Sequence, residues 1–426
     1  MKIFNNPPRE EWPDLCERGG SDNEAVSKTA RLILERVRKG GDAALTAITR
    51  EIDGLEILDF RVSDAEIEDA AGMVSEELKK AIDDAIANIR AFHEAQLPKE
   101  ITVETTPGVT CIQRPVPIAN VGLYIPGGTA PLFSTVLMLA VPAAIAGCRR
   151  VVMCSPCGKD GKIAPVVVYA ASRCGIREIY KLGGAQAIGA MAYGTQTILP
   201  VDKIFGPGNR YVTAAKQTVS QQGTAIDMPA GPSEVMVLAD SSADPEFVAA
   251  DLLSQCEHGR DSQAIAVCDS EELAKRIAEA TERQAAALKR CDYVNESLAN
   301  SRIIILSDRS AMVDFANRYA PEHLIISLGD AEAVLNEISA AGSVFMGNYS
   351  PESAGDYASG TNHTLPTAGW AASLSGVNTD AFMRKMTIQT ITPEGLRALA
   401  PTIISMAEAE GLDGHANAVR VRVVEK

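Results

Sequence analysis

The chain of 426 residues is 46% hydrophobic and 22% charged, a composition typical of a soluble globular protein, and its length predicts more than one hydrophobic core. Its 55 acidic residues outnumber its 40 basic ones, and the net charge of −15 would repel nucleic-acid backbones and anionic membrane surfaces. We therefore expect neither nucleic acid nor a membrane as a partner.

The compartment and the state of the thiols follow from two further features. Residues 1–8 contain no apolar signal-peptide core, and the apolar run 135–146 is too short to span a bilayer, so we expect a cytoplasmic protein. Nine cysteines, an odd number scattered along the chain, fit reduced thiols better than disulfides. Cys154 and Cys157 have the C-x-x-C redox spacing, but loop cysteines after a strand are common, and we favour that interpretation.

Residues 1–118 are predicted to be mainly helical, and Ser63 and Glu66 have capping-box spacing ahead of an amphipathic stretch. From residue 119 the pattern changes to short apolar strands that alternate with helical segments. This alternation predicts βαβ units around a parallel sheet, and hence a first Rossmann-like domain over residues 119–231. Its expected strands are 121–125, 150–153, 178–182 and 203–205.

The same alternation starts again over residues 232–379 and predicts a second Rossmann-like domain. Its expected strands are 235–239, 264–268, 302–306, 323–327 and 343–346. The predicted fold class is therefore α/β, with two incomplete Rossmann-like domains that each contain a parallel sheet. Residues 347–369 are polar and rich in Gly and Ser, a length and composition that indicate a functional loop.

The tail, residues 380–426, is too short to bury a core of its own, so it must dock on another part of the protein. Thr392 and Pro393 predict the start of a helix that ends near Gly411. Residues 419–424 have the pattern of a last strand.

Four of the five histidines lie beside acids or amides in compact polar motifs: His258, His323, His363 and His415. Imidazole titrates near neutral pH and is the commonest metal ligand, so these motifs indicate metal binding and proton transfer. The fifth, His93, ends a charged helix, and we interpret it as a surface residue.

A metal site is predicted where a helix ends. Asp244 and Pro245 start that helix, and Gln255 and His258, three residues apart, share a face at its end. They could hold one ion together, or they could simply be a polar helix end that faces water. Asp356, in the Gly-rich loop, adds an oxygen ligand that suits Zn²⁺ or a similar divalent ion.

Glu322 and His323 follow Pro321 and open an apolar strand. An adjacent acid and imidazole could divide proton removal from a substrate and activation of water between them. The alternative is a buried histidine that bonds to a local carbonyl group.

Three Gly-rich turns follow predicted strands and precede helices, at residues 122–128, 183–186 and 206–209. Backbone amides at such positions attract phosphate, which favours a nucleotide, but no G-x-G-x-x-G motif is present and tight structural turns remain the alternative.

The motifs Gly-Leu-Tyr-Ile-Pro-Gly-Gly, Phe-Gly-Pro-Gly-Asn, Ala-Pro-Glu-His, Gly-Thr-Asn-His-Thr-Leu-Pro-Thr and Glu-Gly-Leu-Asp-x-His, in this order, resemble the L-histidinol dehydrogenase family from about residue 121 to the C-terminus. The resemblance implies a zinc-dependent homodimer that uses two NAD⁺ to oxidise L-histidinol, through L-histidinaldehyde, to L-histidine in the last step of histidine biosynthesis. It also implies that residues 380–426 are swapped onto the partner subunit.

The resemblance further implies roles for individual residues. Glu322 and His323 would be the acid/base pair. The implied zinc ligands are Gln255, His258, Asp356 and His415, and these ligands together with His323 would also face the substrate. The other implied substrate contacts are Ser233, His363 and Glu410, and the implied NAD contacts are Tyr124, Gln186 and Asn209. Two departures are visible: Cys256 stands where the family more often has alanine, and residues 157–163 are longer than typical.

Rival functions stay open at this point. A zinc hydrolase would use the same groups on water without a nucleotide, and a scaffold with structural zinc would need no open metal position. A related zinc- and NAD-dependent dehydrogenase could act on another amino or sulfonated alcohol. The Gly-rich turns favour a dehydrogenase, and Glu410 and His363 favour histidinol.

Overall fold

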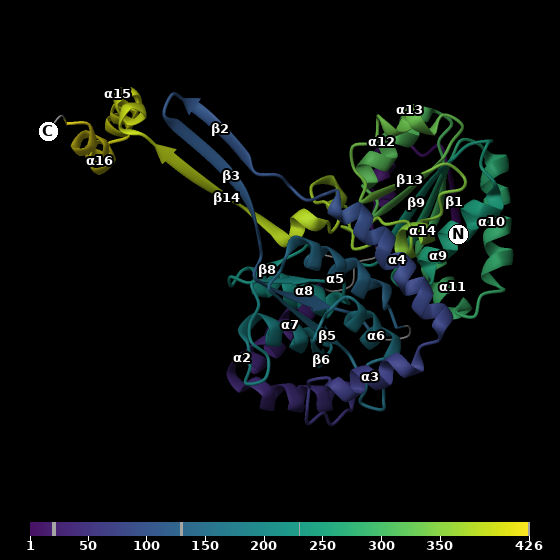
Figure 1. Cartoon of the computed structure of the whole chain (residues 1–426). Helices are drawn as coiled ribbons and strands as arrows, with labels where there is room; N and C mark the ends of the chain where they lie inside the picture. The colour runs from purple at the N-terminus through teal and green to yellow at the C-terminus, as the bar shows by residue number, and fades with distance from the viewer. Residues whose placement is uncertain (19–22, 128–130, 230, 425–426) are drawn as a thin grey trace.

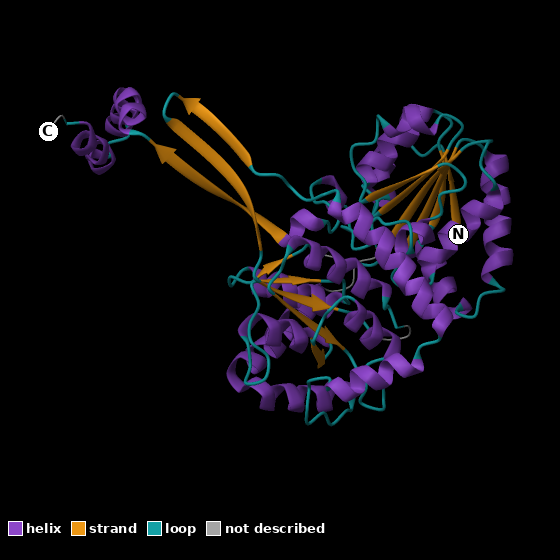
Figure 2. Ribbon diagram, viewed as in Figure 1, coloured by secondary structure: helices purple, strands orange, loops and turns teal. Residues whose placement is uncertain are grey.

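The computed structural model describes residues 1–18, 23–127, 131–229 and 231–424. It contains two α/β units, each built on a parallel sheet, and an extended antiparallel arm (Figures 1 and 2). The predicted α/β class with two parallel sheets is therefore confirmed, whereas the boundaries at residues 118, 231 and 379 remain predictions. Within the described ranges, no helix is long and apolar enough to cross a membrane.

The first sheet has five parallel strands in the order β6-β5-β4-β7-β8. The strands are β4 (Asn120–Tyr124), β5 (Arg150–Ser155), β6 (Glu178–Lys181), β7 (Lys203–Phe205) and β8 (Ala225–Ile226). The helices between them are α5 (Ser134–Ala146), α6 (Pro165–Arg173), α7 (Gly184–Tyr193) and α8 (Arg210–Ser220). Four of these strands were predicted, and the short β8 was not.

Helices from the N-terminal region cover both faces of this sheet: α2 (Asn23–Asp53), α3 (Asp64–Met73) and α4 (Glu76–Glu94). Helix α2 packs on α7 and α8, whereas α3 packs on α6 and α4 packs on α5. The unit therefore has two apolar cores, one on each face. The predicted capping box is present, because Ser63 and Glu66 bond to each other's backbone amides at the start of α3.

The second sheet has six parallel strands in the order β1-β11-β10-β9-β12-β13. The strands are β1 (Lys2–Asn5), β9 (Glu234–Ala239), β10 (Gln263–Cys268), β11 (Arg302–Ile305), β12 (His323–Ser327) and β13 (Ser343–Met346). One face is covered by α9 (Pro245–Cys256), α10 (Glu271–Ala285) and α11 (Cys291–Asn300), and the other by α1 (Trp12–Leu15), α12 (Arg309–Tyr319) and α13 (Ala331–Leu335). The expectation of a mainly helical N-terminal region missed β1, which pairs with β11 at the sheet edge.

The arm is a three-stranded antiparallel sheet, in the order β14-β3-β2, that projects away from both units (Figure 2). It combines β2 (Ile101–Thr106) and β3 (Val109–Pro117) with β14 (Met383–Ile391) from the tail. Helices α15 (Pro393–Ala409) and α16 (Asp413–Val423) lie at its far end, and the chain terminates there (Figure 1). Thr392 caps α15 with its side chain, as the sequence predicted.

Two predictions about single segments are wrong. Residues 419–424 were expected to be a strand, but nearly all of them belong to α16, because Ala416 and Val419, three residues apart, form its buried face against α15. His93 was expected at the surface, but it is fully buried at the end of α4. Its Nδ1 lies 2.8 Å from the carbonyl oxygen of Ile89 and its Nε2 lies 3.3 Å from Nδ2 of Asn362, so it joins α4 to the second half of the chain.

Candidate active site

The two predicted acid/base residues lie at the amino end of β12, beside the amino end of β9. Helix α12 ends at Tyr319, and its capping residue Ala320 is left-handed. Pro321 follows and leads the chain to Glu322 and His323 at the start of β12. Both side chains are buried. Because β9 and β12 are parallel neighbours, Glu234, the first residue of β9, lies next to this pair.

Glu322 is held by two donors. Its Oε2 accepts a hydrogen bond of 2.8 Å from the backbone amide of Glu234 and one of 3.3 Å from the side-chain amide of Gln255. Burial raises the pKa of Glu322 to about 8, although the nearby His323 lowers it. A carboxyl group with such a pKa can exchange a proton near neutral pH.

The orientation of His323 is set by a backbone carbonyl. Its Nδ1 lies 3.1 Å from the carbonyl oxygen of Glu234, which can only accept, so Nδ1 carries the proton in this contact. Its Nε2 lies 3.7 Å from Oδ1 of Asp356 and has no hydrogen-bond partner among the described residues. Burial alone would lower the pKa of His323, but the carboxylates of Glu352, Glu322 and Asp356 raise it to about 10.

Residues with metal-ligand chemistry surround that free nitrogen. His258 follows the end of α9, and its Nε2 lies 3.8 Å from Oδ2 of Asp356. Asp356 lies in α14 (Glu352–Tyr357), a helix within the segment that was predicted to be a loop. His258, Glu352 and Asp356 place one ligand atom each within 4.8 Å of one another. Oε1 of Gln255 is buried and has no hydrogen-bond partner in the described part of the chain, as expected of an oxygen reserved for a cation.

Asp356 is the centre of this cluster. Burial raises its pKa, but the neighbouring imidazoles of His323, His363 and His258 together lower it by more, so the net shift is downward. The group is therefore a carboxylate at neutral pH. A carboxylate with an imidazole and an amide oxygen beside it suits Zn²⁺.

His363 connects the cluster to the first unit. Its Nδ1 lies 2.9 Å from the backbone oxygen of Asp356, and its Nε2 lies 3.3 Å from Oγ1 of Thr135 in α5. Burial lowers the pKa of His363, so it is neutral at physiological pH. The candidate site therefore lies against the boundary between the two units.

The three predicted nucleotide contacts lie at or just after the carboxyl ends of strands of the first sheet. The hydroxyl of Tyr124 accepts a 3.1 Å hydrogen bond from the amide of Gly184 at the start of α7. Gln186, two residues further on, is buried, and its Oε1 has no partner among the described residues. Asn209 caps α8 with its side chain. A cavity of about 630 Å³ opens beside Gly127 and Ser155 at the same edge.

Gly206 brings one of these turns close to Tyr124. Its φ of 121° is accessible essentially only to glycine, and a Cβ at this position would lie 2.0 Å from the carbonyl oxygen of Tyr124. The turn 206–209 can therefore approach β4 only because glycine stands there.

The other three predicted site residues lie outside the cluster around Asp356. Ser233 directly precedes Glu234 and is partly buried at the same edge of the second sheet. Glu410 and His415 are exposed and lie in the tail at the far end of the arm, away from the cluster around Asp356 (Figure 1). Within this chain the structure does not bring them to the other site residues.

The sequence interpretation missed Glu352 and Glu234. Pro351 and Glu352 start α14, and Glu352 lies four residues before Asp356, so helical spacing places both on one face. That spacing was available in the sequence but is obscured by the surrounding glycines and serines. Glu234 orients Glu322 and His323 through its backbone amide and carbonyl, and such a role cannot be recognised from the residue type in the sequence.

The cysteines fit the expected reduced state. All nine are free. Burial raises the pKa of Cys154 and Cys157 to about 12, which gives no support to a redox role for the pair. Cys256 is fully buried in the apolar core of the second unit, and burial raises its pKa too.

Comparison with known proteins identifies the family. The family model described as histidinol dehydrogenase matches residues 16–423. Histidinol dehydrogenase of Bacteroides fragilis strain YCH46 is 54% identical over 100% of this chain and 99% of its own length, and that of Escherichia coli K12 is 51% identical over 95% and 92%. The crystal structure of histidinol dehydrogenase from Elizabethkingia anophelis superposes with a TM-score of 0.96 at 49% identity, over 99% of this chain and 98% of that one. The chain belongs to the histidinol dehydrogenase family.

Proposed function

We propose that the protein oxidises L-histidinol through L-histidinaldehyde to L-histidine, the last step of histidine biosynthesis, with zinc bound and two NAD⁺ consumed per turnover. Family membership over nearly the whole chain supports the oxidation of histidinol. The observation that carries the proposal is the buried cluster of Glu322, His323 and Asp356, in which proton-transfer groups adjoin metal ligands. We expect this reaction to take place in the cytoplasm.

The metal would be held by Gln255, His258 and Asp356, and by His415 of a second copy. The buried, unpartnered Oε1 of Gln255 and the proximity of His258 to Asp356 both fit a cation. Zinc, when bound, would supply a Lewis acid that holds and orients the substrate. Positive charge at this place would also lower the pKa of His323, because Asp356 would then stabilise the imidazolium less.

His323 would remove the hydroxyl proton of histidinol through Nε2, since Nδ1 is occupied by the carbonyl of Glu234. The carbon–hydrogen bond of the alcohol would break at the same time and leave an aldehyde. NAD⁺, when bound, supplies the hydride acceptor. We assign its contacts to Tyr124, Gln186 and Asn209, which lie at the edge of the first sheet that faces helix amino termini.

Glu322 would then take a proton from the water that attacks the aldehyde carbon. The hydrated aldehyde would then lose a hydride to the second NAD⁺ and two protons in all, which leaves the carboxylate of histidine. Burial supports this role, because the pKa of about 8 lets Glu322 accept and release protons near neutral pH. The remaining substrate contacts would come from Ser233 and His363, and from Glu410 of a second copy.

The position of the tail supports a homodimer. Glu410 and His415 are exposed at the end of the projecting arm, which cannot bury a core by itself (Figure 1). Apolar side chains on the arm and its helices are left open to solvent, including Ile101, Val103, Met406 and Val421. We propose that residues 380–426 dock on a second copy and complete its site.

A spectrophotometric assay tests the function. NADH formation from L-histidinol is measured for the untreated protein, after chelation, and after Zn²⁺ is restored. We expect the untreated protein to form NADH, the chelated protein to lose this activity, and added Zn²⁺ to restore it. Full activity of metal-free protein would exclude the role of zinc, and no NADH formation by the zinc-loaded protein would exclude the proposed reaction.

A further inference from the structure

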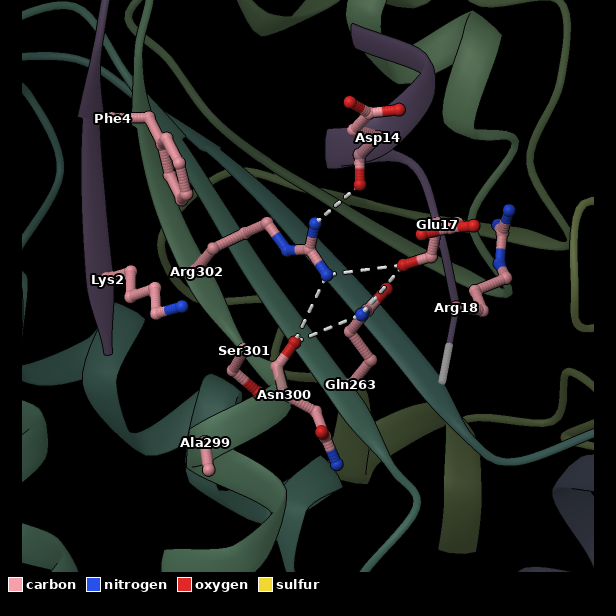
Figure 3. A pocket seen from close by; sticks show the side chains of 10 residues that line it. All are labelled: Lys2, Phe4, Asp14, Glu17, Arg18, Gln263, Ala299, Asn300, Ser301 and Arg302. Carbon is pink, nitrogen blue, oxygen red and sulfur yellow. Dashed lines mark hydrogen bonds between the residues drawn. The ribbon is translucent and has the colours of Figure 1, made fainter. Parts of the chain in front are cut away.

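Arg18 comes from the N-terminal segment and reaches the amino edge of the second sheet. There it lines a cavity of about 460 Å³ together with Arg302 and Gln263 (Figure 3). Arg302 donates to the backbone oxygens of Leu15, at 2.7 Å, and of Glu17, at 3.2 Å. These bonds fasten the segment that carries Arg18 to β11.

The guanidinium group of Arg18 is fixed by Glu234 and by Tyr319. Its Nε lies 2.6 Å from Oε1 of Glu234, and its Nη2 lies 3.1 Å from Oε2 of the same carboxylate. Nη2 also donates to the backbone oxygen of Tyr319 at 2.6 Å, and the group stacks 3.9 Å from the centre of the Tyr319 ring. A forked pair of this kind defines the orientation of a carboxylate as well as its charge.

The carboxylate of Glu234 is 3% exposed, and Arg18 is 22% exposed on the outer side of the pair. Oε1 also accepts a 2.9 Å hydrogen bond from the amide of Ala368. The side chain is therefore anchored on both sides, and the start of β9 is anchored with it.

The backbone of Glu234 holds both proton-transfer groups. Its amide donates to Oε2 of Glu322 at 2.8 Å, and its carbonyl accepts from Nδ1 of His323 at 3.1 Å. One peptide position therefore sets the direction of the Glu322 carboxylate and the tautomer of His323.

We propose that Arg18 is a positioning residue: by clamping the carboxylate of Glu234, it fixes the backbone groups that orient Glu322 and His323. The inference rests on the acid/base roles assigned above. Among the described residues, Arg18 bonds to Glu234, Tyr319 and Cys16 but not to Gln255, His258 or Asp356, so its loss should disturb proton transfer and leave metal and substrate binding unchanged.

The test compares Arg18→Gln, which removes the charge and the fork, with Arg18→Lys, which keeps a charge but not the fork. Arg309→Gln is the matched control, because Arg309 pairs with Asp240, which follows the opposite end of the same strand β9, at 3.3 Å. Steady-state kinetics with histidinol and with histidinaldehyde, zinc content and thermal unfolding are measured for each variant.

We expect Arg18→Gln to lower kcat at least about tenfold with both substrates, since misplacing catalytic groups by about 1 Å can cost a hundredfold. Its KM values and zinc content should stay near wild type. Arg18→Lys should recover part of kcat, and Arg309→Gln should keep it within about twofold. A wild-type kcat in Arg18→Gln or Arg18→Lys overturns the proposal, as does a rise in KM or a loss of zinc without a fall in kcat.

Two variants distinguish failure of the positioning role from misfolding and from failure of the acid/base assignment. If Arg18→Gln does not fold, Arg18→Lys alone decides, since it must show a reduced kcat with unchanged KM. His323→Gln is assayed in parallel: if it retains full activity, the acid/base assignment itself fails. If His323→Gln is inactive while both Arg18 variants are fully active, only the positioning role fails.

Discussion

The side-chain amide nitrogen of Gln255 lies 3.3 Å from Oε2 of Glu322, while the oxygen of the same amide is buried and has no hydrogen-bond partner among the described residues. The contact with Glu322 fixes which end of the amide faces the carboxylate. The oxygen is thereby left for a cation, so one residue connects the proposed acid/base group to the proposed metal.

Replacing Gln255 should therefore weaken zinc binding. We expect Gln255→Leu to raise the dissociation constant for Zn²⁺ by about tenfold to a hundredfold, because it removes a ligand oxygen and the group that orients Glu322. Competition with a chromogenic chelator measures this. Gln284→Leu, at a partly exposed position on α10 where the side chain bonds only to Glu246 among the described residues, is the control. Unchanged affinity in Gln255→Leu would contradict the ligand assignment.

Cys256 should not act as a nucleophile. Its side chain lies in the apolar core, and burial raises the pKa of its thiol, whereas a nucleophilic cysteine needs a thiolate. We expect Cys256→Ala to retain most of the NADH-forming activity. A loss of more than about a hundredfold in a correctly folded variant would point to covalent catalysis.

Glu322 and His323 should be separable by half-reaction. If Glu322 activates water, Glu322→Gln oxidises supplied histidinaldehyde poorly but retains more of the first oxidation, because His323 remains oriented by the carbonyl of Glu234. Single-turnover measurement of each hydride transfer distinguishes the steps. An equal loss in both would show that the two groups do not divide the work in this way.

The tail gives a complementation test. His258→Ala and His415→Ala should each be inactive as homodimers. In a mixed dimer, one site would carry both lesions and the other neither, so co-refolding of the two variants should restore part of the activity. Absence of recovery in a verified mixed dimer would mean that the tail completes the site of its own chain.

Lys216 should be important for stability. It is buried beside Asp227 and donates to the carbonyl of Gly206 at 2.8 Å, while Asp227 accepts from the amide of Gly206 at 2.7 Å. Lys216→Met leaves the Asp227 carboxylate buried without its cation, which should cost about 3–5 kcal/mol in the free energy of unfolding. Urea denaturation measures the change. Lys39→Met, which breaks an exposed pair with Glu35, should leave stability close to wild type.

The two parallel sheets could be predicted because each strand is a short apolar run with a turn at both ends, as at 235–239 and 264–268. The start of α9 could also be predicted, because Asp244 and Pro245 are a strong capping pair and cap it in the structure. Both patterns depend only on neighbouring residues, and the structure contains the elements that they predict.

The arm and the tail helix were missed for physical reasons. Pro107 and Gly108 between two β-branched runs are a hairpin signal, and Gly108 does adopt a φ of 81°. However, β2 is mostly exposed and β3 mostly half-buried, and both lack the apolar runs that mark a core. In α16, the alternating Val and Arg from Val419 mimic a strand, and only the packing of Ala416 and Val419 against α15 favours the helix.

Some residues of the candidate site could be predicted from the sequence and others could not. Imidazoles and carboxylates in compact motifs can be recognised one at a time, and so Asp356 and His258 could be named before their proximity was known. Glu234 and Arg18 act through a backbone position and an ion pair between distant parts of the chain. Such relationships depend on the register of β9 against β12, which no local pattern encodes.

The strand at the N-terminus has a consequence for the order of folding during synthesis. Lys2 pairs with Arg302 and Asn5 pairs with Ile305, so β1 leaves the ribosome long before its neighbour β11 exists. The strands of the first sheet all lie between Asn120 and Ile226, so that sheet can pair its strands earlier. During synthesis β1 therefore stays without its neighbour until β11 has been made, and β3 similarly waits for β14. In pulse-labelled hydrogen exchange, the amides of β4 should become protected before those of β10. Until β11 has been made, β1 offers an open strand edge to which a chaperone or a second nascent copy could bind.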